Sequence, residues 1–567
     1  MKRTLRTVLV ILILGLMLGG LSLTWQTTTQ AQQNQAPGFT PSTSPASSAW
    51  DAYRNASRIA DSQKRIEALE KVTVDFPQEP VTPKAHQMII NILVKNSPGQ
   101  KDLIFKHIQQ AIETTPEFGK ATVCDDIATS LIDAGVLLDK AAELADQALA
   151  LSTTRFKDTN EIAMRSANFT HDALQGLIYL KQGRTKEAEK TLLSAYNVYT
   201  PANVGGIVPA SMFKWVACGL AEVAEKDGKI EKALDYLLTV STLGKIDARL
   251  FPEKLLLGKI DAIVTQQLEQ TYRRAHHDSL AGLEEIIDAR YEKEFPLPVR
   301  PQPYKPTAAR SDRTVLAEVF TGAGCVPCVA ADLSMDAFLE RYQRQDVIVL
   351  MYHIHAPVPD PMANPSTKAY AKYYNVRGVP TVEIDGKVGL PEGGGGRDQA
   401  KEVYNKLQPL IDRELEVKAE AEIKLEAKMA NSVIQVAAQV KPTKADASHL
   451  KLQIALVEDR LRFSGENRVR FHPMVVRSLA GEKAGGLALT GKSEVMTWKF
   501  DLKAITQELK QHLDDLEKDW KGETYSFAEK KHVMDPNHLL VVAFVQDEQT
   551  KQVLQAASLK VNSSGSK

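Results

Sequence analysis

A cluster of five prolines divides this sequence into two parts that follow different patterns. The prolines are Pro296, Pro298, Pro301, Pro303 and Pro306. A segment so rich in proline cannot continue an α-helix, and it favours a stiff, extended backbone. Before the cluster, apolar residues recur every three or four positions, which predicts helices; after it, β-branched runs alternate with helical segments. We therefore expect a domain boundary at residues 295–310, in a chain of 567 residues.

The N-terminal segment predicts export. Three basic residues among the first six precede an apolar run over residues 8–23, and a polar stretch then ends at Ala31. This order is typical of a signal peptide that is cleaved after Ala31, although an uncleaved signal anchor is an alternative for an apolar run of this length. No cysteine precedes Cys124, so the sequence offers no acceptor for a lipid anchor. Both alternatives place the chain outside the cytoplasm, either in a periplasm or as a secreted protein. Disulfide chemistry is possible in both locations.

The region 49–294 contains helical segments that resemble one another. A pattern of amphipathic helix recurs at residues 65–76, 177–199 and 220–239, and the last two segments carry a glycine turn between two helices. These segments resemble tetratricopeptide repeats in degenerate form, which implies a solenoid with a concave surface for a protein partner. An irregular helical bundle is the alternative. Residues 32–48, rich in Gln, Ser, Thr and Pro, are expected to be a linker.

Charge and cysteine content limit the classes of function. The chain has 70 Lys and Arg residues against 70 Asp and Glu residues, so it has no net field to attract nucleic acid, and we expect no nucleic-acid partner. Its four cysteines are too few for a disulfide scaffold. Cys124 and Cys218 lie in the helical region, where we expect them to fill the core, with a disulfide between them as the alternative.

The motif Cys325-Val-Pro-Cys328 is the feature that carries chemistry. It follows a predicted strand at 315–320 and opens a predicted helix at 328–342. A cysteine at a helix N-terminus meets unpaired backbone N–H groups and the positive end of the helix dipole, which favour its thiolate. The second cysteine is close enough to resolve a mixed disulfide. A zinc site would need two further Cys or His ligands, and no second motif supplies them.

A second anchor lies downstream, where Val379-Pro380 precedes a predicted strand at 381–384. Together with the strand, the motif and the helix, it resembles the thioredoxin superfamily. The resemblance implies a thioredoxin-like domain in which Pro380 is cis and lies against the motif. It also implies that Cys325 is the nucleophile, that Cys328 resolves the mixed disulfide, and that Val379 and Pro380 dock the substrate backbone. No cofactor is expected beyond the Cys325–Cys328 disulfide.

Two departures from that family precede the motif. Glu318 stands seven residues before Cys325, where many thioredoxins carry a buried acid six residues before, so we interpret Glu318 as a proton acceptor for Cys328. Strand alternation alone would equally allow Glu318 to face solvent. The loop 321–324, Thr-Gly-Ala-Gly, is expected to be flexible and to leave the first sulfur more exposed than usual.

Other polar clusters in this region have simpler interpretations. His353, His355 and Asp360 could together bind a metal, but we favour a loop that covers one end of the sheet, and we predict no metal site. Gly393–Gly396 lacks the Lys-Ser/Thr ending of a phosphate-binding loop and is interpreted as a flexible connection before the last helix of the domain.

Beyond residue 416 the pattern becomes mainly β, with one helix at 502–520. The predicted strands are Val433–Val440, Leu450–Val457, Met474–Leu479, Met496–Leu502, Leu539–Gln546 and Gln552–Val561. Short alternating or apolar runs of this kind predict a β-sandwich with a helical insertion.

The expected architecture is multidomain: an α-helical repeat solenoid, an α/β thioredoxin-like domain and a mainly-β, sandwich-like domain. The predicted boundaries are 1–31 for the signal peptide, 32–48 for the linker, 49–294 for the repeats, 295–310 for the Pro-rich linker, 311–415 for the thioredoxin-like domain, 416–562 for the β domain and 563–567 for a tail.

The sequence thus predicts an exported thiol–disulfide oxidoreductase that acts on protein disulfides and is presented by the helical scaffold. Its expected partners are proteins with cysteines and an unknown redox partner. Contact with a membrane is expected only if the N-terminal segment is not cleaved. The alternative is a non-catalytic extracytoplasmic scaffold or assembly protein whose thioredoxin-like domain only binds.

Overall fold

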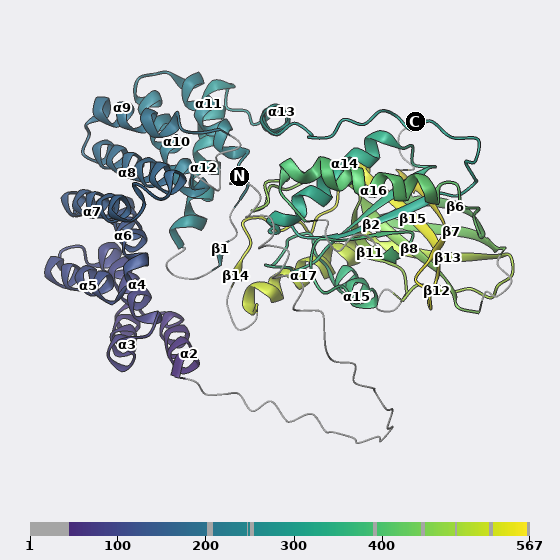
Figure 1. Ribbon diagram of the computed structural model, residues 1–567, viewed down its shortest axis with the longest axis horizontal. Helices are drawn as coiled ribbons and strands as arrows, with labels where there is room; N and C mark the ends of the chain where they lie inside the picture. Colours follow the sequence, from purple (N-terminus) through teal and green to yellow (C-terminus); the bar gives the residue numbers. More distant parts are fainter. Residues whose placement is uncertain are drawn as a thin grey trace, which may run out of the picture. The chain divides into compact units, whose positions relative to one another are not determined.

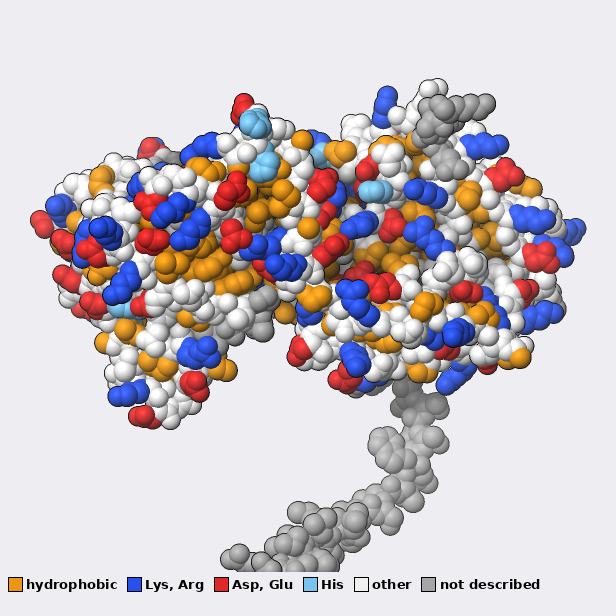
Figure 2. All heavy atoms as spheres, turned by 90° about the horizontal axis from the view of Figure 1, so that it is seen from above, with side chains coloured by type: hydrophobic (Ala, Val, Ile, Leu, Met, Phe, Trp, Pro, Cys, Tyr) orange, Lys and Arg blue, Asp and Glu red, His pale blue; other side chains and the backbone are white. Residues whose placement is uncertain are grey.

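The computed structural model describes residues 45–200, 208–245, 248–249, 255–388, 394–443, 448–481, 485–520 and 525–563. The predicted signal peptide, residues 1–31, lies outside these ranges. Within them, no helix is both long and apolar enough to cross a bilayer. In Figure 2, basic and acidic side chains are intermixed over the visible face, as expected from the zero net charge.

The N-terminal part is helical, as predicted. Its helices are α2 (Pro45–Ser57), α3 (Ser62–Asp75), α4 (Val81–Asn96), α5 (Lys101–Thr114), α6 (Lys120–Ala134), α7 (Leu138–Phe156), α8 (Glu161–Lys181), α9 (Thr185–Tyr196), α10 (Ala210–Lys226), α11 (Ile230–Ser241), α12 (Leu255–Ala275) and α13 (Leu283–Glu294). From α3 to α12, each helix packs against its successor in the chain, and several also pack against the next but one, as in a helical repeat. The likeness to tetratricopeptide repeats stays a prediction.

Small residues allow these helices to cross closely. Ala188 of α9 and Ala233 of α11 are fully buried. A Cβ atom added to Gly176 of α8 would lie 2.7 Å from the Leu192 side chain of α9, and one added to Gly219 of α10 would lie 3.0 Å from the same leucine. Leu192 therefore fills the space that two glycines leave open, which joins three successive helices.

In the α/β part, strands alternate with helices as predicted, in the order β-α-β-α-β-β-α. Its strands are β2 (Val315–Thr321), β3 (Val347–His353), β4 (Thr381–Ile384) and β5 (Lys387–Val388), and its helices are α14 (Val329–Arg341), α15 (Pro365–Tyr373) and α16 (Ala400–Glu414). β2 pairs parallel with β3 and antiparallel with β4, which gives the order β3-β2-β4-β5. The expected α/β thioredoxin-like fold class is confirmed.

The longer C-terminal strands are divided between two sheets, one of which is the α/β sheet. β8 (Leu450–Glu458), β11 (Val475–Leu479), β15 (Leu539–Asp547) and β16 (Val553–Lys560) continue the α/β sheet, because β11 pairs parallel with β3. Figure 1 shows β2, β11, β8 and β15 in the same part of the molecule, and the strand pairing places them in one sheet in the order β2-β3-β11-β8-β15. With the short β12 (Leu487–Ala488), this sheet has nine strands in the described part of the chain. The predicted boundary at 415/416 is thus not an edge of the sheet.

A second sheet makes the C-terminal part sandwich-like, as predicted. It contains β6 (Ala421–Ala430), β7 (Val433–Pro442), β13 (Glu494–Asp501) and β17 (Asn562–Ser563). Its apolar side shares one core with β8 and β15 and with α17 (Leu502–Lys518), the predicted helical insertion. β6 was not predicted, although its alternating exposure is that of a half-buried strand. The short pairs β9 (Leu461–Arg462) with β10 (Phe471–His472), and β1 (Ala248–Arg249) with β14 (Tyr525–Ser526), complete the pairing.

The two faces of β2 enter different cores. Val315, Ala317 and Val319 pack against α14 and α16, whereas Leu316 and Phe320 join a core with α15 and the C-terminal strands. Side chains of a strand alternate between faces, so the residue number decides which core each side chain enters.

The large sheet curves until distant strands meet. The backbone N–H of Val553, the first residue of β16, donates to the carbonyl of Asp385, which follows β4, over 2.9 Å. The buried Arg313 side chain donates to both residues: to the Asp385 carboxylate over 2.8 Å and to the Val553 carbonyl. The start of β16 therefore meets the end of β4, and strands enclose the core that lies between them on both sides.

Candidate active site around Cys325 and Cys328

The cysteine motif lies between the end of β2 and the start of α14. Cys325 has an extended backbone, residues 326–328 form one 3-10 turn, and α14 begins at Val329. The two sulfurs form a disulfide, with their Cα atoms 5.3 Å apart. Pro327 occupies an early turn position, where a missing N–H leaves no helical bond unmade. The predicted strand–motif–helix arrangement is thus present.

Val379 and Pro380 lie beside the first cysteine. The Val379–Pro380 peptide bond is cis, as predicted. The Cys325 Sγ lies 3.9 Å from the Val379 carbonyl oxygen. The structure therefore brings together Cys325, Cys328, Val379 and Pro380, which are four of the five predicted site residues.

The cysteines are covered, contrary to the expectation of an exposed first sulfur. Cys325 is 1% exposed and Cys328 is 0% exposed, while Val326 between them is 58% exposed. Gly395 lies against the motif, because its N–H donates to the Pro327 carbonyl over 2.7 Å. Gly324 packs against Val358, so closely that a Cβ atom at position 324 would collide with that side chain.

The loop 321–324 is held in place, and the expectation of a flexible loop is wrong. The N–H of Ala323 donates to Asp360 Oδ2 over 2.6 Å, and the carbonyl of Ala323 accepts from the N–H of Asn467 over 2.9 Å. Asn467 belongs to the C-terminal part of the chain. The local sequence of the loop gives no indication of this contact. The glycines here permit close packing against neighbouring backbone.

Glu318 is buried on the face of β2 that belongs to the other core. Its carboxylate accepts hydrogen bonds from the hydroxyls of Tyr352, over 2.8 Å, and Tyr374, over 2.9 Å. Burial raises the pKa of Glu318 to about 7, although both tyrosine hydroxyls oppose the shift. Glu318 lies on the same face of β2 as Leu316 and Phe320, and this face is directed away from α14. The structure does not bring Glu318 to the cysteines.

A different acid lies on the side of the cysteines. Asp332 stands four residues after Cys328 on α14, so the two side chains share one face of the helix, one turn apart. Asp332 is 1% exposed, and neither of its carboxylate oxygens has a hydrogen-bond partner among the described residues. Burial raises its pKa to about 7. The i, i+4 spacing was the signal in the sequence that could have identified it.

Two polar side chains from the strands face Asp332. Thr321 and His353 are directly paired at the ends of β2 and β3, and both continue the strand face that packs on α14. Both groups oppose the rise in the pKa of Asp332 that burial causes. The Thr321 hydroxyl does not, however, reach hydrogen-bond geometry with the carboxylate. The His353 Nε2 also has no hydrogen-bond partner within the described ranges.

His353 is oriented by Asp360, whose Oδ2 lies 2.9 Å from its Nδ1. Burial would raise the pKa of Asp360, but His353 and the N–H groups of Ala323 and Met362 hold it at about 2. His355 instead pairs with His512 of α17, with their Nε2 atoms 2.8 Å apart. Among the described side chains, no group of three or more His, Cys, Asp or Glu could hold a metal ion.

Cys124 and Cys218 are free and buried in the helical part. Burial raises the pKa of Cys124 to about 11 and that of Cys218 to about 12. Thiols of this kind are unreactive. The prediction that they fill the helical core is confirmed.

Comparison with known proteins concerns the C-terminal third of the chain. Residues 367–565 match the family model of outer membrane protein Omp28. The matched part begins in α15, so it includes Val379 and Pro380 but neither cysteine of the motif. No curated protein matches the chain.

A solved structure is also similar in part. It is the crystal structure of a domain of the outer membrane lipoprotein Omp28 from Porphyromonas gingivalis, with 16% identity over 26% of this chain and 90% of that chain, and a TM-score of 0.17. At that TM-score the superposition supports no structural argument. The extracytoplasmic location predicted from the N-terminal segment agrees with the description of the matching family model.

Proposed function

We propose that the chain is an extracytoplasmic thiol–disulfide oxidoreductase that acts on disulfides of protein substrates. The observation that carries this proposal is the Cys325–Cys328 disulfide at the start of α14, with the Val379 carbonyl 3.9 Å from the Cys325 sulfur. In the reduced form, Cys325 attacks a substrate disulfide, and Cys328 then resolves the mixed disulfide. The edge at Val379 and Pro380 offers backbone groups to an extended substrate segment.

The helical region is proposed to select the partner. Stacked helices present an extended surface on which a protein client can bind while its disulfide reaches the motif. Electrostatic attraction contributes little to this selection, because the chain has no net charge. A redox partner of the thiol–disulfide class must then reset the Cys325–Cys328 pair.

The decisive experiment is reduction of insulin disulfides by the purified chain, with a dithiol as the electron source. We expect turnover by the wild type and none by Cys325→Ser. The Cys328→Ser variant should accumulate a mixed disulfide through Cys325, and mass spectrometry of that adduct from an extracytoplasmic extract identifies the client. Equal rates for wild type and Cys325→Ser would contradict the proposal.

The burial of Cys325 favours one second function, a non-catalytic scaffold with a structural disulfide. Reactive cysteines are usually partly accessible, whereas Cys325 is 1% exposed, and Gly395 and Val358 pack against the nearby Pro327 and Gly324. The scaffold function predicts that a native-state thiol reagent leaves Cys325 unmodified after reduction. The oxidoreductase function predicts rapid modification of Cys325 and protection of Cys328.

A further inference from the structure

The resolving cysteine, Cys328, has no route for its proton on the side of the motif where the substrate binds in the proposed function. Cys328 must lose a proton before its sulfur can attack, yet its side chain is fully buried. On the side of the proposed substrate site, Cys325 is itself 1% exposed, and Gly395 and Val358 pack against Pro327 and Gly324 of the same segment. Proton exchange therefore needs a polar path on another side.

Helix α14 carries such a path in its sequence. Asp332, Asp336 and Glu340 follow Cys328 at intervals of four residues, so the four side chains form one row along the helix. Asp332 is buried without a hydrogen-bond partner among the described residues. Asp336, the next member, is half-buried and lines a pocket of about 560 Å³. The row thus leads from a buried sulfur to a cavity that is open to solvent.

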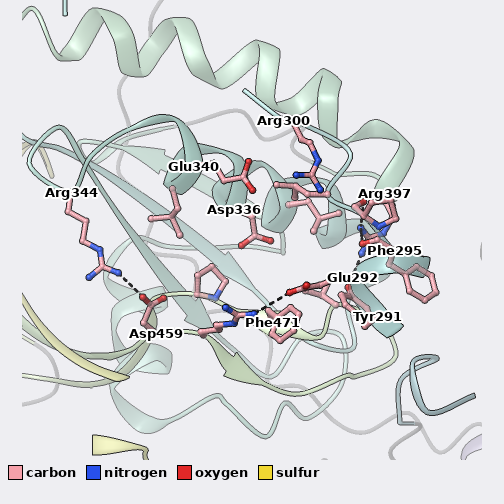
Figure 3. A pocket seen from close by; sticks show the side chains of 17 residues that line it. Tyr291, Glu292, Phe295, Arg300, Asp336, Glu340, Arg344, Arg397, Asp459 and Phe471 are labelled. Atoms are coloured by element: carbon pink, nitrogen blue, oxygen red, sulfur yellow. Dashed lines mark hydrogen bonds and ion pairs between the residues drawn. The ribbon is translucent and has the colours of Figure 1, made fainter. Parts of the chain in front are cut away.

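The pocket lies between α13, α14 and the segment from Asp459 to Pro473. Figure 3 shows Asp336 and Glu340 on the α14 side of this pocket, and Glu292 on the other. Arg344 pairs with Asp459 over 2.6 Å, and Arg397 donates to the Tyr291 hydroxyl over 2.8 Å. The pocket is therefore lined by polar groups around Asp336, as a path for protons requires.

We propose that Asp332 accepts the proton of the Cys328 thiol and exchanges it through Asp336 with solvent in this pocket. The inference rests on the proposed function for its chemical step. After proton transfer, the Cys328 thiolate attacks the Cys325 sulfur. The Cys325–Cys328 bond forms, the bond between Cys325 and the substrate sulfur breaks, and the substrate sulfur leaves as a thiolate with the electron pair. The two electrons come from the dithiol, which an external dithiol-class reductant regenerates.

The groups that face Asp332 suit this role. Thr321 faces it from β2, His353 from β3 and Asp360 from the loop after β3, while Asp336 follows on its own helix. Burial places the pKa of Asp332 at about 7, so its carboxyl is partly ionised near neutral pH and can both take and release a proton. A buried neutral imidazole, His472, packs edge-on against His353, with ring centres 5.0 Å apart; burial lowers its pKa to about 3.

Asp336 is suited to relay the proton onward. Burial and the neighbouring Asp332 raise its pKa to about 8. Arg397 from the turn before α16 opposes that shift, whereas Glu340 and Asp459 add to it. The proton affinities of the two acids are thus close, which favours transfer in either direction.

The first experiment measures the titration of Cys328 without any turnover. The reduced Cys325→Ser protein is titrated by its thiolate absorbance, and the signal of the Cys325→Ser/Cys328→Ser protein is subtracted to remove Cys124 and Cys218. Adding Asp332→Asn should lower the pKa of Cys328 by about one unit, since it removes a nearby negative charge. An unchanged titration would overturn the proposal.

Matched controls remove acids that the proposed transfer from Cys328 through Asp332 and Asp336 does not use. Glu318→Gln removes a buried acid from the other face of β2, and Glu340→Gln removes the exposed acid at the end of the row. Both should leave the Cys328 titration unchanged. A shift with Glu318→Gln equal to that with Asp332→Asn would also overturn the proposal, because it would show a general effect of charge.

The second experiment separates the two chemical steps. The reduced full chain is mixed with an aromatic disulfide, which releases one thiol on attack by Cys325 and a second on attack by Cys328. Asp332→Asn should slow the second release about 100-fold near neutral pH and leave the first unchanged. Asp336→Asn, close to the surface and therefore tolerated by the fold, should slow the second release more than Glu340→Gln does.

The two proposals fail in different ways. A wild type that releases no second thiol contradicts the proposed function, whereas the Cys328 titration still tests the link to Asp332. A second release that is equally fast in Asp332→Asn and wild type contradicts the proton path, and it leaves the oxidoreductase function supported. If Asp336→Asn and Glu340→Gln behave alike, the exit through the pocket is refuted.

Discussion

The buried ion pair that closes the curved sheet gives the sharpest stability prediction. Arg313 is fully buried, and it bonds both the Asp385 carboxylate and the Val553 carbonyl. The other carboxylate oxygen of Asp385 accepts from the N–H of Leu316 over 2.8 Å. Replacing Arg313 by Met removes both donations and leaves a buried carboxylate with a single donor. We expect a loss of about 3–5 kcal/mol, because one member of a buried pair is left uncompensated.

This loss should depend on pH. Burial raises the pKa of Asp385 to about 6 even though Arg313 opposes the shift, so the pKa must rise further in Arg313→Met. A carboxyl whose pKa is higher in the folded than in the unfolded state destabilises the fold progressively as the pH rises from about 4. The difference between variant and wild type should therefore be smaller at pH 5 than at pH 8.

Urea unfolding with peptide-resolved hydrogen exchange measures both effects, because the strand that begins at Val553 should lose protection first. The control is Arg344→Met, which removes the partly exposed ion pair with Asp459 and should cost less than about 1 kcal/mol. Arg313→Met combined with Asp385→Asn should recover part of the loss. If the single variant loses no more than Arg344→Met, or if the double variant is no more stable than the single one, the reasoning is refuted.

Three further predictions use other parts of the structure. Glu318→Gln should have the same free energy of unfolding as wild type near pH 4 and be about 1–3 kcal/mol more stable at pH 8. The reason is that the raised pKa of Glu318 costs stability as the pH rises from about 4.5 to about 7, and urea titrations at both pH values measure this difference. Cys124 and Cys218 should resist a thiol reagent at pH 8 in the native protein and react on unfolding, as a colorimetric assay would show. Gly322→Ala should cost about 1–3 kcal/mol in urea unfolding, because its Cβ would lie 2.5 Å from the Ala356 carbonyl oxygen.

Local patterns in the sequence were sufficient to predict the elements around the cysteines. The predicted strand at 381–384 coincides with β4, and helix α14 begins directly after the cysteine motif. These features depend on residues close in sequence: β-branched runs favour strands, and the position of Pro327 suits a helix start. The cis bond before Pro380 was predicted from resemblance to a family rather than from local propensity.

Long-range pairing was not visible in the same patterns. The parallel pairing of Val475 with Met351 joins strands that are more than a hundred residues apart in the sequence. The apolar sequence of β15 indicates a strand that is buried on both faces, but it does not indicate with which strands β15 pairs. The local sequence of the loop 321–324 likewise gives no sign that Asn467 holds it.

The alternation of side chains along β2 explains why Glu318 is not the acid near the cysteines. The face of β2 that carries Glu318 lies opposite the face that packs on α14. Here the C-terminal strands and α15 close that face, and Tyr352 and Tyr374 bind the carboxylate. Under the proposed proton path, the face toward α14 must supply the acid instead, and Asp332 is the buried carboxyl that α14 places one turn from Cys328. The face of β2 on which each side chain lies therefore determines which acid can serve the cysteines, and a variant of Asp332 tests whether this placement extends to the chemistry.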